Sequence, residues 1–110
     1  MRWYGRLGRS SEIALVRRRG RPAPTASLVA YGLPEPTGST RVAVTVASSV
    51  GGAVVRNLVR RRIRGALDGL GPRPGGLRLL LVAKPAAGAT PYGRLAVDVA
   101  NALRRLREPA

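Results

Sequence analysis

The residues best placed to do chemistry in this sequence are arginines at helical spacing. Arg56, Arg60 and Arg64 recur at every fourth residue, so on a helix they would form one ridge. Asn57 and Arg61 fall beside that ridge, and no acidic residue lies among them. Like charges four residues apart repel one another by roughly a few tenths of a kcal/mol per pair, whereas a guanidinium can hold phosphate with two donors at once. The spacing therefore predicts a surface for nucleic-acid phosphates, and it does not by itself choose between RNA and DNA.

The charge of the whole chain agrees with a polyanionic partner. Its 20 basic residues, all but one of them arginine, stand against 5 acidic ones, which gives a net charge of +15. Such an excess repels itself in a compact fold until a polyanion neutralises it. A genome of biased base composition would explain the preference for arginine over lysine, but not the scarcity of Asp and Glu. The composition therefore indicates a nucleic acid or another polyanion as the partner.

Catalytic and metal-binding side chains are scarce. The chain has no His and no Cys, which excludes disulfides, Cys or His metal sites, and catalysis by either side chain. The acidic residues are scattered, with no pair at metal-ligand spacing, which disfavours a stand-alone nuclease. They are Glu12, Glu35, Asp68, Asp98 and Glu108. We therefore expect the protein alone to have no catalytic residues and to bind no metal or cofactor.

The elements that must position the arginines fit into one domain. With 110 residues, 45% of them hydrophobic, the chain suffices for a single domain over 1–110 with an aliphatic core. Residues 1–9 are basic and contain glycine, and we expect them to form a flexible arm. No apolar run approaches the roughly 20 residues of a membrane span, and residues 1–9 lack a signal-peptide pattern. We therefore expect a cytoplasmic protein that does not contact a membrane.

The first half of the chain is predicted to contain one helix and two strands. Ser10 or Ser11 can cap a short helix that ends before Gly20. Residues 27–33 and 41–47 have strand patterns, and the second alternates cleanly between valine and smaller residues. A turn-rich loop separates these two strands, so we expect them to pair as a hairpin.

The second half of the chain is predicted to add a crossover. The arginine helix should span 53–67, and the continuous apolar run 77–83 predicts a central strand buried on both faces. Thr90 followed by Pro91 predicts the cap and first position of a last helix. The resulting order is α-β-β-α-β-α. It indicates a two-layer α/β sandwich in which the last strand joins the hairpin through a helical crossover.

Residues 41–64 also follow a longer ordered pattern. A valine-rich strand leads into a short glycine-containing turn, then into Ala-Val-x-Arg-Asn and further arginines. This order resembles the protein subunit of bacterial ribonuclease P. The similarity extends to residues 28–31, which match the family's first strand including its tyrosine, and to 80–86, which match its last strand and exit. The resemblance thus spans nearly the whole chain.

The resemblance implies a fold, partners and a function. The family fold is an α/β sandwich of this order, and its subunit binds a large catalytic RNA and precursor tRNA without a further protein partner. The holoenzyme removes the 5′ leader of precursor tRNA, and its Mg²⁺-dependent chemistry belongs to the RNA. The positions that match the family's RNA-binding helix are Arg56, Asn57, Arg60, Arg61 and Arg64. The positions that match its leader cleft, between the first helix and the sheet, are Ile13, Arg17, Tyr31 and Thr45.

The sequence departs from the family pattern at several positions. Leu58 stands where the third motif residue is arginine, and Gly52 stands where asparagine is usual. Ile13 and Arg17 replace aromatic residues of the first helix. Because stacking on an aromatic ring contributes about 1–3 kcal/mol per base, we expect a weaker hold on the leader unless Tyr31 and stacking by arginine compensate. A general basic RNA- or ribosome-binding protein with no role in tRNA processing is the alternative.

Overall fold

A mixed five-stranded sheet with the order β1-β4-β5-β3-β2 organises the chain. The computed structural model describes residues 2–108, so Met1 of the predicted arm and residues 109–110 of the predicted domain lie outside the described part. The strands are β1 (Gly5–Arg6), β2 (Arg21–Pro24), β3 (Leu28–Pro34), β4 (Arg41–Val46) and β5 (Leu77–Ala83). The helices are α1 (Ser10–Arg19), α2 (Ala53–Asp68) and α3 (Tyr92–Arg107), with short 3-10 turns η1 (Ser48–Val50) and η2 (Pro85–Ala89).

Strands β4 and β5 are parallel neighbours that α2 connects. Their register pairs Val42 with Leu79 and Val44 with Leu81. In β5, Leu79 and Leu81 on one face are 0% exposed and Leu80 on the other face is 1% exposed. A strand covered on both faces has apolar side chains at successive positions, which explains the continuous apolar run. The predicted crossover helix and central strand are both confirmed.

The prediction that the strands at residues 27–33 and 41–47 pair as a hairpin is wrong. Strand β5 lies between β3 and β4 and pairs with both, antiparallel to β3 and parallel to β4. The hairpin partner of β3 is β2, whose register places Pro22 opposite Tyr31. As an edge strand, β2 accommodates two prolines because one side of it has no hydrogen-bonding neighbour. The most apolar strand takes the central position, which displaces the pairing expected from proximity in sequence.

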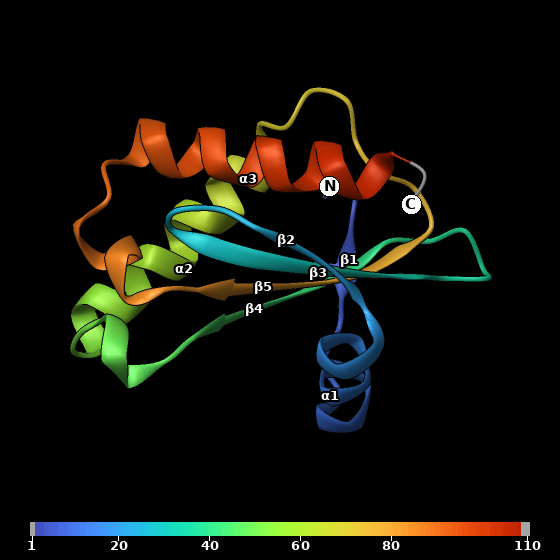
Figure 1. Ribbon diagram of the computed structural model, residues 1–110, viewed down its shortest axis with the longest axis horizontal. Helices are drawn as coiled ribbons and strands as arrows, with labels where there is room; N and C mark the ends of the chain where they lie inside the picture. Colours follow the sequence, from blue (N-terminus) through green and yellow to red (C-terminus); the bar gives the residue numbers. More distant parts are fainter. Residues whose placement is uncertain (1, 109–110) are drawn as a thin grey trace.

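The helices cover the two faces of the sheet unequally. Figure 1 shows α2 and α3 on one face and α1 on the opposite face. The larger core lies between the sheet and α2 with α3. A smaller core under α1 contains Leu7, Val16, Ala43 and Leu80. The predicted fold class, an α/β sandwich with a crossover helix, is confirmed, and α1 adds partial cover on the second face.

The N-terminal segment expected to be a flexible arm is paired with the sheet, which corrects the prediction for its described part. Gly5 and Arg6 form β1, parallel to β4 and in register with Arg41 and Val42. Leu7 is 2% exposed in the smaller core. The single apolar side chain of Leu7 was too weak a signal to predict a strand whose partner lies far along the sequence.

Helix α3 closes the larger core, although its start differs from the prediction. Pro91 occupies the capping position itself, not the first helical position. The Thr90 hydroxyl donates to the carbonyl of Ala86 in η2 (2.7 Å) in place of capping α3. No helix within residues 2–108 is long and apolar enough to cross a membrane. The cytoplasmic location expected from the sequence stays a prediction.

Candidate RNA-binding surfaces

Helix α2 is fixed to the sheet by one apolar stripe. Val59, Ile63 and Leu67 recur every fourth residue and are at most 1% exposed. At the start of the helix, a Cβ on Gly51 would lie 2.9 Å from the side chain of Val55. The glycine turn therefore allows a close approach between the chain entering α2 and the first turn of the helix. This packing leaves the opposite stripe of α2 facing solvent.

The predicted RNA-binding residues lie on that opposite stripe. Asn57, Arg61 and Arg64 are exposed, while Arg56 and Arg60 are half-buried. Arg60 donates from Nη1 to Oδ1 of Asn57 at 2.9 Å. Arg56 donates from Nη1 to the carbonyl of Gly51 at 3.2 Å, which ties it to the start of the helix. These hydrogen bonds orient two of the guanidinium groups without neutralising them.

A hollow of about 490 Å³ gathers most of the predicted residues. Its lining side chains come from α2 and from the N-terminal segment. They are Arg2, Asn57, Arg60, Arg61, Arg64, Gly65 and Asp68. Arg56 lies one turn nearer the start of α2 and is not among them. The structure thus brings four predicted residues to one concave site and places the fifth beside Gly51.

The N-terminal segment is a part of this surface that the sequence analysis missed. Arg2 pairs with Asp68 (3.1 Å, Nε to Oδ1), and the Tyr4 hydroxyl donates to the same oxygen at 3.4 Å. Trp3 donates from Nε1 to the carbonyl of Leu67 at 2.8 Å. Partial burial, and then the negative charge of Asp68, raise the pKa of Tyr4 above its usual range. The aromatic pair between the arginines of residues 1–9 was the available signal.

The four predicted leader-cleft positions lie on or next to the face that α1 covers. Tyr31 is in register with Leu80, and both pack in the smaller core with Ile13 of α1. Thr45 of β4 lies on the same face of the sheet as Tyr31 and is half-buried. Arg17 is exposed on α1. The structure therefore brings Ile13 and Tyr31 together and leaves Arg17 exposed in the last turn of α1, next to Arg18 and Arg19. The role of these residues stays a prediction.

A salt-bridge cluster fixes α1 to the sheet. Arg41 of β4 contacts Glu12 of α1 at 2.7 Å and Glu35 at 2.9 Å, both through Nη2. Arg78 adds a longer contact to Glu35, 3.9 Å from Nε to Oε1. Hydrogen bonding from Arg41 lowers the pKa of both carboxyl groups below their ordinary value. The start of α1 is thereby held at a defined place beside the sheet.

Four of the acidic residues, those other than the exposed Glu108, make structural contacts through their side chains. Asp98 of α3 is 7% exposed and accepts a hydrogen bond of 2.6 Å from the buried Ser27 hydroxyl. Glu12, Glu35 and Asp68 have the arginine partners described above. Within residues 2–108 no three His, Cys, Asp or Glu side chains gather as a metal site would require. That the protein alone binds no metal or cofactor stays a prediction.

Fold and surface together define a small α/β protein with an arginine-lined helix exposed beside a mixed sheet. The sequence profile of one family, Ribonuclease P, matches residues 1–107. The ribonuclease P protein component of Streptomyces bikiniensis is 39% identical, over 92% of this chain and 90% of that protein. The component of Acidothermus cellulolyticus is 37% identical, over 94% of this chain and 88% of that protein. The chain belongs to the ribonuclease P protein family.

Solved structures show the same fold at low sequence identity. The ribonuclease P protein of Staphylococcus aureus superposes with a TM-score of 0.84 at 16% identity, covering 93% of this chain and 94% of that one. The protein from Thermotoga maritima gives a TM-score of 0.79 at 19% identity, covering 94% and 97%. The resemblance found between residues 41–64 and this family is thus confirmed, and so is the fold.

Proposed function

We propose that this protein is the protein component of ribonuclease P and binds the catalytic RNA through the α2 surface. The observation that supports this most strongly is the hollow lined by Asn57, Arg60, Arg61 and Arg64. Its one acidic residue, Asp68, is paired with Arg2. The guanidinium groups are therefore available to phosphates, whose binding releases the counterions condensed on the RNA. The names of the curated relatives support the assignment to ribonuclease P.

The second part of the proposal concerns precursor tRNA. Ile13 and Tyr31 form a partly apolar surface beside α1, and Arg17 supplies a nearby positive charge. An unpaired leader needs contacts of both kinds, a surface for bases and cations for phosphates. The α1 face would then hold the 5′ leader while the α2 surface holds the catalytic RNA. Two separate surfaces would let one small protein bind catalyst and substrate at the same time.

The catalytic step belongs to the RNA in this proposal. The leader would be removed by hydrolysis of a phosphodiester, and Mg²⁺ held by the RNA would supply the Lewis-acid chemistry. The carboxylates of Asp68, Glu12, Glu35 and Asp98 are held by Arg2, Arg41 and Ser27. The contribution of the protein is to neutralise phosphate repulsion between the two RNAs. That role predicts the largest benefit where Mg²⁺ is too scarce to do the same.

Reconstitution with the cognate catalytic RNA tests this function. The protein should raise the rate of precursor-tRNA cleavage at Mg²⁺ concentrations too low for the RNA alone, and should cleave nothing by itself. An unrelated basic protein of similar size and charge is the control for simple charge neutralisation. No stimulation at any Mg²⁺ concentration would reject the assignment and favour a general RNA- or ribosome-binding protein.

A further inference from the structure

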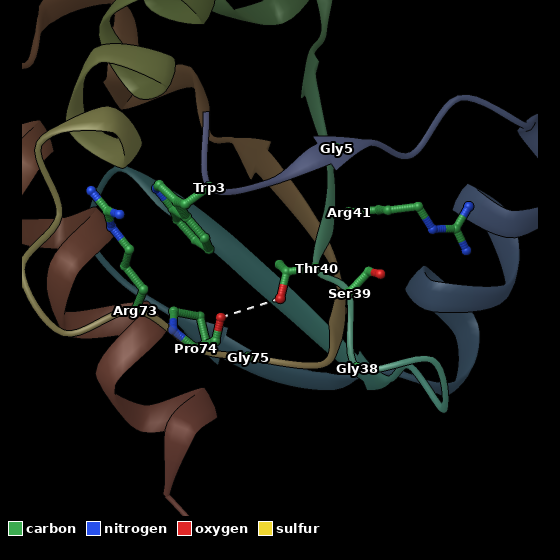
Figure 2. A pocket seen from close by; sticks show the side chains of 9 residues that line it. All are labelled: Trp3, Gly5, Gly38, Ser39, Thr40, Arg41, Arg73, Pro74 and Gly75. Atoms are coloured by element: carbon green, nitrogen blue, oxygen red, sulfur yellow. Dashed lines mark hydrogen bonds between the residues drawn. The ribbon is translucent and has the colours of Figure 1, made fainter. Parts of the chain in front are cut away.

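A second hollow, of about 700 Å³, lies at the edge of the sheet near β1. It is bounded by the N-terminal segment, the loop before β4, and the loop between α2 and β5, as Figure 2 shows. The residues that line it are Trp3, Gly5, Gly38, Ser39, Thr40, Arg41, Arg73, Pro74 and Gly75. None of these residues lines the hollow of the α2 arginines, and none is among the four leader-cleft positions.

The aromatic side chain of this hollow is held in place but not buried. Trp3 is half-exposed, and its Nε1 hydrogen bond to Leu67 fixes the indole at one edge. Tyr4 packs against it edge to face, with ring centroids 5.1 Å apart. The guanidinium of Arg73 lies over the indole, 5.7 Å from the ring centroid. A fixed indole with an adjacent guanidinium offers a nucleobase both π-stacking and cation–π contact.

The remaining walls of the hollow leave room for a planar ligand. A Cβ on Gly38 or Gly75 would meet no atom within 4 Å, so the space beside these positions is open. Thr40 is tied to the carbonyl of Pro74 through its hydroxyl at 3.2 Å, which holds the two loops together. Figure 2 shows Arg41 directed away from the indole, toward α1. The hollow is therefore open beside its glycines, and the guanidinium of Arg73 makes it positively charged on the side of Trp3.

This hollow continues into the α2 surface. Trp3 and Arg73 also line an intervening hollow of about 490 Å³ together with Arg2 and Asp68. Arg2 and Asp68 in turn line the hollow of the α2 arginines. Neighbouring hollows thus share lining residues from the arginine surface to the sheet edge. A strand of RNA bound by its phosphates on α2 would reach Trp3 along these hollows.

We propose that the hollow at Trp3 binds an unpaired nucleotide of the RNA on α2, with its base stacked against Trp3 and Arg73. This inference rests on the proposed function and adds a base-binding site to a surface that otherwise contacts phosphates. Arg2, which lines both hollows of the α2 side, supplies the cation for the phosphate next to that base. The site recognises any base because stacking needs only an aromatic face. The competing explanation is that Trp3 only fastens the N-terminal segment to α2.

The fluorescence of Trp3 tests this directly, because the chain contains a single Trp. The full-length protein is titrated with a single-stranded RNA of about ten nucleotides, long enough for one such groove. A parallel titration uses an abasic chain of the same length and charge. Stacking predicts quenching with the base-bearing RNA and little change with the abasic chain. Equal responses to both, or no response while RNA binding is measured independently, would overturn the proposal.

Substitution gives a second readout, the ratio of affinities for the base-bearing and abasic chains. Trp3→Leu should lower this ratio about fivefold or more, since stacking contributes about 1–3 kcal/mol per base and about 1.4 kcal/mol is tenfold. Arg73→Ala should lower the ratio less, and Arg104→Ala, at an exposed position of α3, should leave it unchanged. A ratio unchanged by Trp3→Leu and Arg73→Ala would reject the site. That result, with cleavage still stimulated, would leave the proposed function standing, whereas no RNA binding at all would reject both.

Discussion

The α2 surface and the α1 face use arginine in opposite ways. On α2, Arg60, Arg61 and Arg64 share a hollow whose one carboxylate is already bound to Arg2. On the α1 face, Arg41 is enclosed between two carboxylates and serves to hold a helix on a strand. The same side chain is a binding group in one place and a structural cross-link in the other. The difference is set by the carboxylates within reach, not by the number of arginines.

The comparison also separates two kinds of RNA contact. The α2 surface offers cations and one amide, which suits the phosphates of a structured RNA. The α1 face adds the partly buried side chains of Ile13 and Tyr31 to the arginines in the last turn of α1, and these apolar side chains suit unpaired bases. Variants of the α2 surface should therefore change the salt dependence of RNA affinity. Variants of the α1 face should change the affinity for precursor tRNA only when its leader is present.

The largest effect should come from the α2 surface. Arg60→Ala combined with Arg64→Ala should lower affinity for the catalytic RNA about a hundredfold at 0.1 M salt, since each phosphate contact contributes a slope of ~0.9 in log K against log salt. The double variant should also flatten that slope by about 1.5–2. Filter binding across a salt series measures both. Arg18→Ala combined with Arg104→Ala, which removes two exposed arginines elsewhere, is the control. An unchanged slope in the α2 variant would remove this helix from the interface.

The α2 surface was predictable from sequence because its signal is local. Apolar and basic residues alternate at helical period within 53–67, and no partner far along the chain is needed to recognise the two faces. The central position of β5 was equally local, since a continuous apolar run needs cover on both faces. The pairing of β3 with β5 and of β1 with β4 could not be predicted from a local signal, because the paired strands lie far apart in the sequence. The contribution of Trp3 was missed for the same reason.

The α1 face should give a smaller effect that depends on the leader. Tyr31→Leu should weaken holoenzyme binding to precursor tRNA about fivefold or more, because a stacked base contributes about 1–3 kcal/mol. Binding to tRNA without a leader should not change, whereas the α2 double variant should weaken assembly with either. Tyr31→Phe keeps the ring and is the matched control. Equal losses with and without the leader would show that Tyr31 acts through packing alone.

Acid should weaken the attachment of α1 to the sheet. Glu12 and Glu35 have a pKa lowered from the ordinary 4.5 in the folded protein, chiefly by hydrogen bonds from Arg41. A lowered folded-state pKa means that the stabilisation is complete above about 4.5 and is lost as pH falls through the folded value. The free energy of unfolding from urea titrations should therefore decrease below pH 4.5. Arg41→Met should make this decrease shallower, and an unchanged pH profile would contradict the role of the cluster.

The smallest effect should come from the one carboxylate inside the α2 hollow. Asp68→Asn removes a negative charge beside the arginines, and since Asp68 is already paired with Arg2 the gain should be modest. We expect RNA affinity to rise about twofold, in keeping with the weak, salt-screened energies of exposed pairs. Arg2→Met should lower affinity by more, because it removes a cation and leaves Asp68 uncompensated. If Asp68→Asn weakened RNA binding instead, the carboxylate would act by holding Arg2 and Tyr4 in place. The N-terminal segment would then order the arginine surface as well as add to its charge.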